Sequence, residues 1–130
     1  DVLVMTAAVL DFRPLNVSSH KIKKGDGPLD LVFEPTHDFL VDLGREKGNR
    51  IVVGFAMETD NAEENAKKKL EAKGLNLIVL NDLNVEGAGF AVDTNVVTFF
   101  DREGNRKAFD RMSKLDVSDR ILDWVVGSWA

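Results

Sequence analysis

The chain has 130 residues, enough for one domain of ordinary size. Its side chains are 44% hydrophobic and 30% charged, and no apolar run approaches the ~20 residues that span a bilayer, which argues against disordered and membrane proteins. Acidic side chains outnumber basic ones by 22 to 17, so no nucleic-acid partner is expected from bulk charge. The absence of cysteine excludes disulfides and thiolate chemistry and fits a cytoplasmic location.

The first third of the chain predicts a strand and then an arm. Residues 2–8 form a continuous, β-branched apolar run, which is typical of a strand buried on both faces. Residues 11–20 are polar, and we expect them to be irregular. Residues 21–24 and 29–33 resemble the two strands of an arm, closed by a glycine turn at residues 25–27.

The middle of the chain predicts two helices around a second buried strand. A short helix is expected from His37 to about Lys47, and residues 51–56 form the buried strand. In the next helix, Asp60 is the expected N-cap, with Glu63 three residues later as in a capping box. Gly74 stands where a C-cap glycine is expected.

The last third predicts a third buried strand at residues 77–80 and then a hairpin. The hairpin strands are residues 95–100 and 106–110, joined by a polar turn that contains a glycine. Ser113 and Asp116 have the spacing of a capping box before the final helix. The face of that helix that we expect to be buried carries Val117, Ile121, Trp124 and Ser128.

Strands alternating with helices, followed by a hairpin, predict an α/β fold. We expect a Rossmann-like three-layer sandwich with a mostly parallel sheet and a C-terminal antiparallel hairpin. Residues 1–130 form a single domain in this prediction. Because a buried strand stands at the very start of the chain, we also expect the N-terminal half of a larger sheet to be missing or supplied elsewhere. The alternative is a minimal domain.

Candidate binding residues lie where the three predicted strands end, at residues 6–8, 54–56 and 81–82, since ligands of open α/β sheets bind at the carboxyl ends of the strands. Ala7 and Ala8 are small enough to let a ligand approach the backbone, although tight packing explains them equally well. Asp11 follows and suits a hydroxyl group or a divalent cation. Lys21, on the arm, suits a phosphate. The alternative to phosphate binding is that Lys21 and the neighbouring lysines form a solvated face.

Two further places suit an anion, each with a plain structural alternative. Lys69 and Lys73 are four residues apart on one helix, where they border the apolar stripe and invite an anion between them. Lysines near the end of a helix also complement its dipole without any ligand. His37 and Asp38 begin a helix whose free amides suit a phosphate, and capping is the alternative for Asp38. The residues by themselves therefore support an anion-receptive edge without naming a reaction.

Several stretches, taken together, resemble phosphopantothenoylcysteine synthetase, which in bacteria is usually the C-terminal domain of a bifunctional coenzyme A biosynthesis protein. The resemblance runs in order through almost the whole chain, and it is the combination that is specific. The stretches are AAVLDFRP at residues 7–14, KIKK at 21–24, VGFAMET at 53–59, LIVLND at 77–82, GFAVDTN at 89–95 and MSK at 112–114, together with Lys69 and Lys73.

The resemblance implies a ligase that joins 4'-phosphopantothenate to cysteine. In this family a nucleoside triphosphate, CTP more often than ATP, activates the pantothenate carboxylate as an acyl-nucleotide and releases pyrophosphate. The cysteine amine then displaces the nucleoside monophosphate. The resemblance also implies Mg²⁺ as cofactor, a cytoplasmic homodimer, and no nucleic-acid or membrane partner.

The resemblance carries a nucleotide site onto residues of this chain. The backbone of Ala7 and Ala8 would hold the base, Asp11 the nucleotide and its Mg²⁺, and Lys21 the phosphates as the catalytic residue. The other nucleotide-binding residues implied are His37, Asp38, Phe39, Phe55, Lys69 and Lys73.

Two departures from the family pattern leave alternatives open. The chain has Thr36-His37-Asp38 where the family usually has Asn-Pro-Asp. The family's glycine-rich nucleotide loop and its asparagine for the acyl-nucleotide precede the strand that opens this chain. The resemblance therefore implies the C-terminal part of a larger synthetase domain, which alone would not catalyse the complete reaction. The alternatives are a noncatalytic nucleotide-binding or assembly module, and another α/β nucleotide-binding protein without a preference for CTP.

Overall fold

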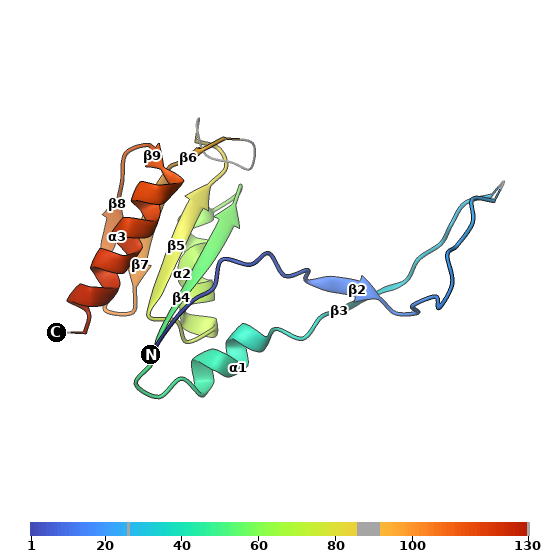
Figure 1. Ribbon diagram of the computed structural model, residues 1–130, viewed down its shortest axis with the longest axis horizontal. Helices are drawn as coiled ribbons and strands as arrows, with labels where there is room; N and C mark the ends of the chain where they lie inside the picture. Colours follow the sequence, from blue (N-terminus) through green and yellow to red (C-terminus); the bar gives the residue numbers. More distant parts are fainter. Residues whose placement is uncertain (26, 86–91, 130) are drawn as a thin grey trace. The chain divides into compact units, whose positions relative to one another are not determined.

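The computed structural model describes residues 1–25, 27–85 and 92–129 (Figure 1). The chain divides into two compact parts, which we describe separately. The sheet unit comprises Asp1–Thr6 and Leu40–Ala130, and the arm comprises Ala7–Phe39.

The sheet unit is built on a five-stranded sheet in the order β1-β4-β5-β7-β8. The strands are β1 (Val2–Val4), β4 (Ile51–Glu58), β5 (Leu77–Asp82), β7 (Val97–Asp101) and β8 (Arg106–Ala108). The first three are parallel, whereas β7 pairs antiparallel with β5 and β8 antiparallel with β7. The parallel strands and the C-terminal hairpin are therefore as predicted.

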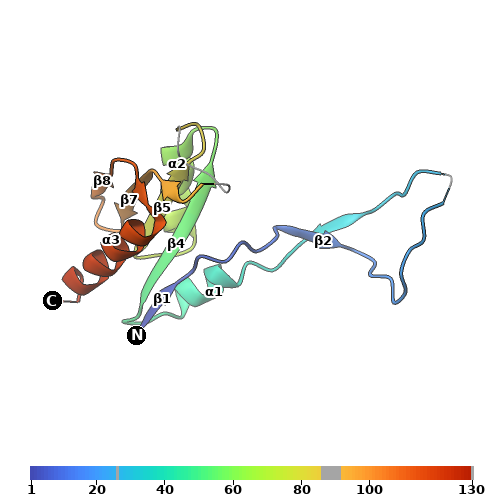
Figure 2. The same ribbon diagram turned by 45° about the horizontal axis from the view of Figure 1, so that its top comes forward.

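Helices cover both faces of the sheet, so the three-layer arrangement is confirmed (Figure 1). On one face, α2 (Ala62–Ala72) packs through Ala66 and Leu70, in a cluster that also includes Leu40 of α1 (Phe39–Arg45). On the other face lies α3 (Lys114–Gly127), as the turned view of Figure 2 also shows. The helix α1 is shorter at both ends than the expected 37–47.

The period-2 alternation of β4 explains its continuous apolar run. Val52 and Ala56 belong to the cluster beneath α2, and Ile51 and Val53 belong to the cluster beneath α3. Phe55 therefore points to the α3 face. Beyond Ala56 on the α2 face comes Glu58, the last residue of the strand.

The first strand differs from its prediction in both length and burial. It ends at Val4, and its three residues are half-buried. Among the described residues β1 pairs only with β4, so one of its edges is not covered by a neighbouring strand, which explains the partial exposure. Ala7 and Ala8, expected at the end of this strand, lie outside it and belong to the arm.

The start of α2 differs from its prediction, and its end agrees. The N-cap is Asn61, in the left-handed region at φ 47°, and no side-chain bond caps the helix. The capping box predicted from Asp60 and Glu63 is therefore wrong. Instead, Glu63 binds Arg106 of β8 across the surface, with Oε1 and Nη2 2.7 Å apart. Gly74 follows the C-cap at φ 59°, as expected of a residue that ends a helix.

The start of α3 agrees with its prediction. Ser113 Oγ accepts from the Asp116 amide at 3.0 Å, and the Asp116 carboxylate accepts from the Ser113 amide at 3.2 Å, so the capping box is confirmed. Ser113 also belongs to a small ladder between β6 (Thr94–Asn95) and β9 (Met112–Ser113). Val125 is buried where Ser128 was expected, because it lies four residues after Ile121 on the inward stripe.

The arm contains a two-stranded ladder, placed differently from the prediction. Strand β2 (Phe12–Pro14) pairs antiparallel with β3 (Phe33–Pro35), as Figure 2 shows. Residues 11–20, expected to be irregular, thus supply a strand. Residues 21–24 and 29–32, expected to be strands, are in none. Part of the predicted turn at residues 25–27 lies outside the described residues.

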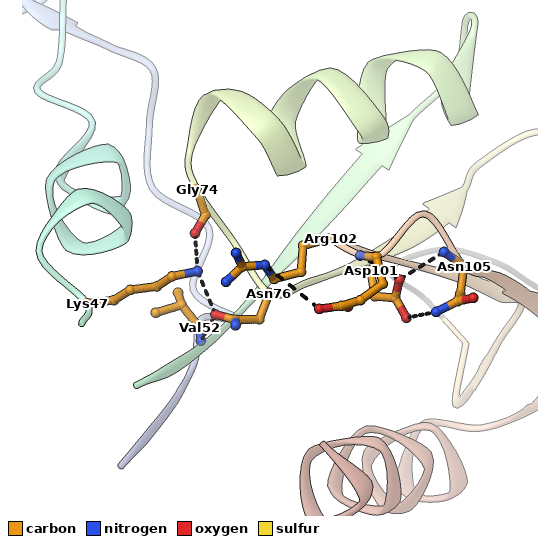
Figure 3. A network of polar contacts seen from close by, with 8 residues as sticks. Lys47, Val52, Gly74, Asn76, Asp101, Arg102 and Asn105 are labelled. Carbon is orange, nitrogen blue, oxygen red and sulfur yellow. Dashed lines mark hydrogen bonds and ion pairs between the residues drawn. The ribbon is translucent and has the colours of Figure 1, made fainter. Parts of the chain in front are cut away.

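A polar network ties the sheet unit together at the amino end of its parallel strands (Figure 3). Lys47 Nζ donates to Gly74 O at 2.5 Å and to Asn76 Oδ1 at 2.8 Å, and the Val52 amide donates to the same Asn76 oxygen at 3.0 Å. Partial burial, and then the nearby Arg102 charge, lower the pKa of Lys47. The network satisfies loop carbonyls and lies at the opposite end of the strands from the ligand edge of α/β sheets.

No helix within the described residues has the length and apolar character needed to cross a bilayer.

Candidate functional site

The carboxyl edge of the sheet unit is formed by the ends of β4 and β5. The last residues of the two strands, Glu58 and Asp82, stand opposite each other in the register. The Leu83 amide donates to Glu58 O at 3.0 Å, and Asn84 Nδ2 donates to the Thr59 carbonyl oxygen. These bonds hold together the two turns that leave the edge.

Phe55 stands out on this edge because it is 37% exposed within a strand whose preceding residues are buried. It lines a pocket of about 380 Å³ on the α3 face. Lys114 and Asn95 bring polar groups to a lining that is mainly apolar. A largely apolar pocket with a few polar groups is the usual form of a small-molecule site. The residues lining the pocket are Val4, Thr6, Phe55, Asn95, Lys114, Val117, Ser118, Ile121 and Leu122.

Lys69 reaches the same edge from the opposite face of β4. Its Nζ lies 2.6 Å from Glu58 Oε1, an ion pair that joins α2 to the end of β4. Asn65 Nδ2, one turn earlier on α2, lies 3.4 Å from Glu58 Oε2. The pairing places the ammonium group of Lys69 beside the edge where a ligand is expected.

The N-terminus of α2 lies at that edge, and Lys73 lies at the opposite end of the helix. It is the C-cap residue, and its backbone oxygen packs against Gly44, where an added Cβ would stand 1.7 Å away. The anion beside Lys69 in this structure is the Glu58 carboxylate. A nucleotide-binding role for Lys73 stays a prediction.

The arm brings Asp11 close to the turn that contains His37 and Asp38. The Thr36 amide donates to Asp11 O at 2.8 Å, and the Thr36 hydroxyl donates to the Leu10 carbonyl oxygen. His37 and Asp38 follow directly and are exposed. Two segments that the resemblance assigns to the nucleotide, separated by more than 20 residues, are thus joined through their backbones.

The other expected residues of the arm are exposed as well. Ala7, Ala8 and Lys21 are exposed and outside any strand, and Phe39, the first residue of α1, is 37% exposed. Seven of the ten candidate residues belong to the arm and three to the sheet unit. Their roles in binding stay predictions.

Asp11 suits Mg²⁺ as a single carboxylate ligand. Within the described part of the chain, no group of three histidine or carboxylate side chains is placed to hold a metal ion. Mg²⁺ in nucleotide sites commonly takes one or two carboxylates and completes its shell with phosphate oxygens and water. The exposed Asp11 suits that arrangement as a single carboxylate.

The sequence predictions placed Asn81 at this edge, as the end of a predicted strand, but gave Glu58 and Lys114 no role there. Glu58 could have been found from its alternation with Ala56, which places it on the α2 face. Asn81 is 5% exposed near the end of β5, and no described residue donates to its Oδ1. The expected stretch at residues 89–95 lies outside the described residues over 89–91.

Comparison with known proteins bears out the family expected from the motifs. Residues 1–128 match the model of the DNA/pantothenate metabolism flavoprotein C-terminal domain. A curated relative, the coenzyme A biosynthesis bifunctional protein CoaBC of Bacillus subtilis, is 51% identical over 122 residues, which cover 94% of this chain and 30% of the relative.

Two solved structures resemble the fold. A crystal structure of the C-terminal domain of CoaBC is 34% identical with a TM-score of 0.73, covering 96% of this chain and 53% of that one. A Cab2 variant in complex with phosphopantothenate-cysteine is 25% identical with a TM-score of 0.63, covering 96% and 45%. The chain thus spans about a third of the length of the curated relatives and about half of these solved chains. It belongs to the family of the DNA/pantothenate metabolism flavoprotein C-terminal domain.

Proposed function

We propose that this chain is the nucleotide-binding part of a phosphopantothenate–cysteine ligase of coenzyme A biosynthesis. The observation that carries the proposal is its 51% identity to CoaBC across 94% of the chain. The likeness to Cab2 adds the chemistry, since the molecule in that complex is the product of joining phosphopantothenate to cysteine. The ligase is then formed together with the portion of the relatives that this chain does not span.

The proposed reaction has two steps, activation of the carboxylate and then formation of the amide. The pantothenate carboxylate oxygen attacks the α-phosphorus of the nucleotide, preferably CTP, and pyrophosphate leaves with the electrons of the broken P–O bond. The cysteine amine then attacks the acyl carbon, loses a proton and displaces the nucleoside monophosphate. The first step builds negative charge on the departing pyrophosphate, and lysines stabilise such charge electrostatically.

The residues on each part of the chain suit these tasks. On the sheet unit, Phe55 offers an exposed ring beside an apolar pocket, and Lys69 offers a cation at the carboxyl edge. On the arm we assign Lys21 to the phosphates and Asp11 to the nucleotide with its Mg²⁺. When bound, Mg²⁺ would neutralise phosphate charge, and the Lys21 ammonium group would stabilise the charge that builds on the departing pyrophosphate.

A homodimer is the proposed assembly. The arm exposes many large apolar side chains, among them Leu10, Val17 and Leu29, which are 77%, 85% and 63% exposed. Exposed apolar side chains concentrated in one segment of the chain favour contact with another chain. We place the enzyme in the cytoplasm, because its cysteine substrate must be kept as the free thiol.

Calorimetric titration of the chain with CTP and Mg²⁺ tests the nucleotide site, with ATP as competitor. We expect CTP to bind more tightly than ATP, and Lys21→Gln and Lys69→Ala each to weaken CTP about tenfold, the loss of one charge-assisted contact. Glu64→Gln, on an exposed part of α2, is the matched control and should bind like the parent chain.

The reaction itself is tested by pyrophosphate release in the protein as its gene encodes it. The ligase predicts release that requires phosphopantothenate and a cysteine-dependent appearance of CMP. Nucleotide binding without either product would contradict the ligase and favour a noncatalytic module. Equal affinity for CTP and ATP would contradict the proposed nucleotide preference.

A further inference from the structure

Glu58 and Lys69 form an ion pair whose two members differ in burial. The side chain of Glu58 is 14% exposed, whereas that of Lys69 is 46% exposed. The backbone of Glu58 is also fixed, because Glu58 is the last residue of β4 and its carbonyl oxygen accepts a hydrogen bond from the Leu83 amide. The carboxylate is therefore the anchored member of the pair, and the lysine is the member that reaches solvent.

A second ion pair on the same helix shows what is unusual about the first. Lys68 Nζ lies 2.7 Å from Glu64 Oε1 on α2, and the two side chains are 67% and 66% exposed. Both belong to one helix, so this pair fixes nothing outside it. The Glu58–Lys69 pair crosses from strand to helix and ends at the carboxyl edge of the sheet.

We propose that Glu58 is a positioning residue, which holds the ammonium group of Lys69 at the carboxyl edge so that it meets the phosphates of the nucleotide. This inference rests on the proposed function. An ammonium group has three donors, so a bond to Glu58 leaves two for phosphate oxygens. A lysine side chain loses rotamer entropy when it is fixed in one position, and holding it beforehand removes part of that cost from binding.

Simple charge repulsion predicts the opposite sign, which makes the proposal testable. A carboxylate near a triphosphate repels it, so without positioning Glu58→Gln would leave CTP affinity unchanged or raise it. With positioning, the same substitution lowers the affinity, because Lys69 is no longer held. Once Lys69 is absent, only the repulsion remains, and removal of the carboxylate no longer weakens binding.

The experiment is a double-mutant cycle on CTP binding, measured by calorimetry with Mg²⁺ in the protein as its gene encodes it. The variants are Glu58→Gln, Lys69→Ala and the double variant. We expect Glu58→Gln to weaken CTP about fivefold and Lys69→Ala about tenfold. The double variant should bind no more weakly than Lys69→Ala alone.

Two controls separate positioning from a general structural effect. Glu64→Gln removes the carboxylate of the neighbouring ion pair and should leave CTP affinity unchanged. Cytidine, which has no phosphates, should bind to the Glu58→Gln variant as to the parent chain. Urea titration of each variant reports its folding, so a loss of CTP affinity with unchanged unfolding free energy supports the proposal.

Each remaining outcome has a defined meaning. If the parent chain binds CTP and the two losses add in the double variant, Glu58 does not act through Lys69, and the inference is wrong while the nucleotide site stands. Unchanged or tighter binding by Glu58→Gln overturns the inference in the same way. If the parent chain binds no nucleotide, the proposed nucleotide-binding role fails and the inference fails with it.

Discussion

Phe55 occupies a position that core packing does not explain. The four residues before it in β4 are buried, and Ala56 after it is buried, yet its ring is 37% exposed beside the pocket on the α3 face. Its neighbour on the same face, Met57, is 39% exposed but does not line the pocket. The two residues therefore allow the effect of the pocket to be separated from the effect of exposed apolar surface.

We predict that Phe55→Ala weakens CTP binding about tenfold, the magnitude expected when an aromatic ring in contact with a nucleotide is lost. Met57→Ala should leave the affinity unchanged. Because both side chains are partly exposed, each substitution should lower the unfolding free energy by about 1–2 kcal/mol. Calorimetry and urea titration provide the two measurements, and equal losses of affinity in the two variants would count against a specific role for Phe55.

At the scale of elements, α1 meets the end of α2 through a glycine. An added Cβ on Gly44 would stand 1.7 Å from the carbonyl oxygen and 2.8 Å from the carbonyl carbon of Lys73. Both atoms belong to the backbone, so a clash cannot be relieved by turning a side chain. The close approach of these helices depends on the absence of a side chain at Gly44.

Gly44→Ala should therefore lower the unfolding free energy by about 3 kcal/mol, at the upper end for overpacked sites. Gly127→Ala is the control, because an added Cβ there meets nothing within 4 Å. Alanine at a helical position is favoured over glycine by up to about 1 kcal/mol, so this variant should be unchanged or slightly more stable. The close helix contact would be refuted if urea titration gave both variants the stability of the parent chain.

The ion pair between Glu63 and Arg106 joins α2 to the last strand of the sheet. The hydrogen bond from Arg106 holds the pKa of Glu63 below its usual value of 4.5. A carboxyl group whose pKa is lower in the folded state stabilises the fold above its unfolded pKa. That contribution is lost as the pH falls through the folded pKa.

Relative to Glu63→Gln, the parent chain should therefore be more stable at pH 7 by about 0.2–1 kcal/mol, as for an exposed pair. The difference should shrink as the pH is lowered from about 4.5 and vanish in strong acid. Urea titrations across pH 3–7 give the measurement. Since exposed pairs are screened, 1 M salt should reduce the difference at pH 7, and a difference that persists at low pH would indicate a contribution other than charge.

At the scale of the whole molecule, local pattern predicted the sheet unit better than the arm. The runs at residues 51–56 and 77–80 became β4 and β5 because buried parallel strands need apolar side chains on both faces. The arm has no such constraint, since nearly all its described residues are exposed. Which of its segments pair was therefore not readable from hydrophobic alternation, and the ladder formed at Phe12–Pro14 and Phe33–Pro35 instead.

The candidate site was also predicted only in part from the sequence. The motifs identified the family, and Phe55 is exposed at the carboxyl edge, while its role in binding stays a prediction. The spacing of Lys69 and Lys73 suggested an anion shared between them, whereas Lys69 pairs with Glu58. Helical spacing places side chains on one face of a helix but does not identify the groups that another element brings against them.

Sequence alone determined the α/β class, the buried strands β4 and β5, the capping box at Ser113 and the family, because each depends on local periodicity or on a run of particular residues. Only the tertiary structure decided the contact of Glu58 with Lys69, the approach of Gly44 to Lys73 and the pairing of the arm. These three contacts depend on which surfaces meet when separate elements pack. The burial of each side chain and the charges around it are then set by residues that are distant in the sequence.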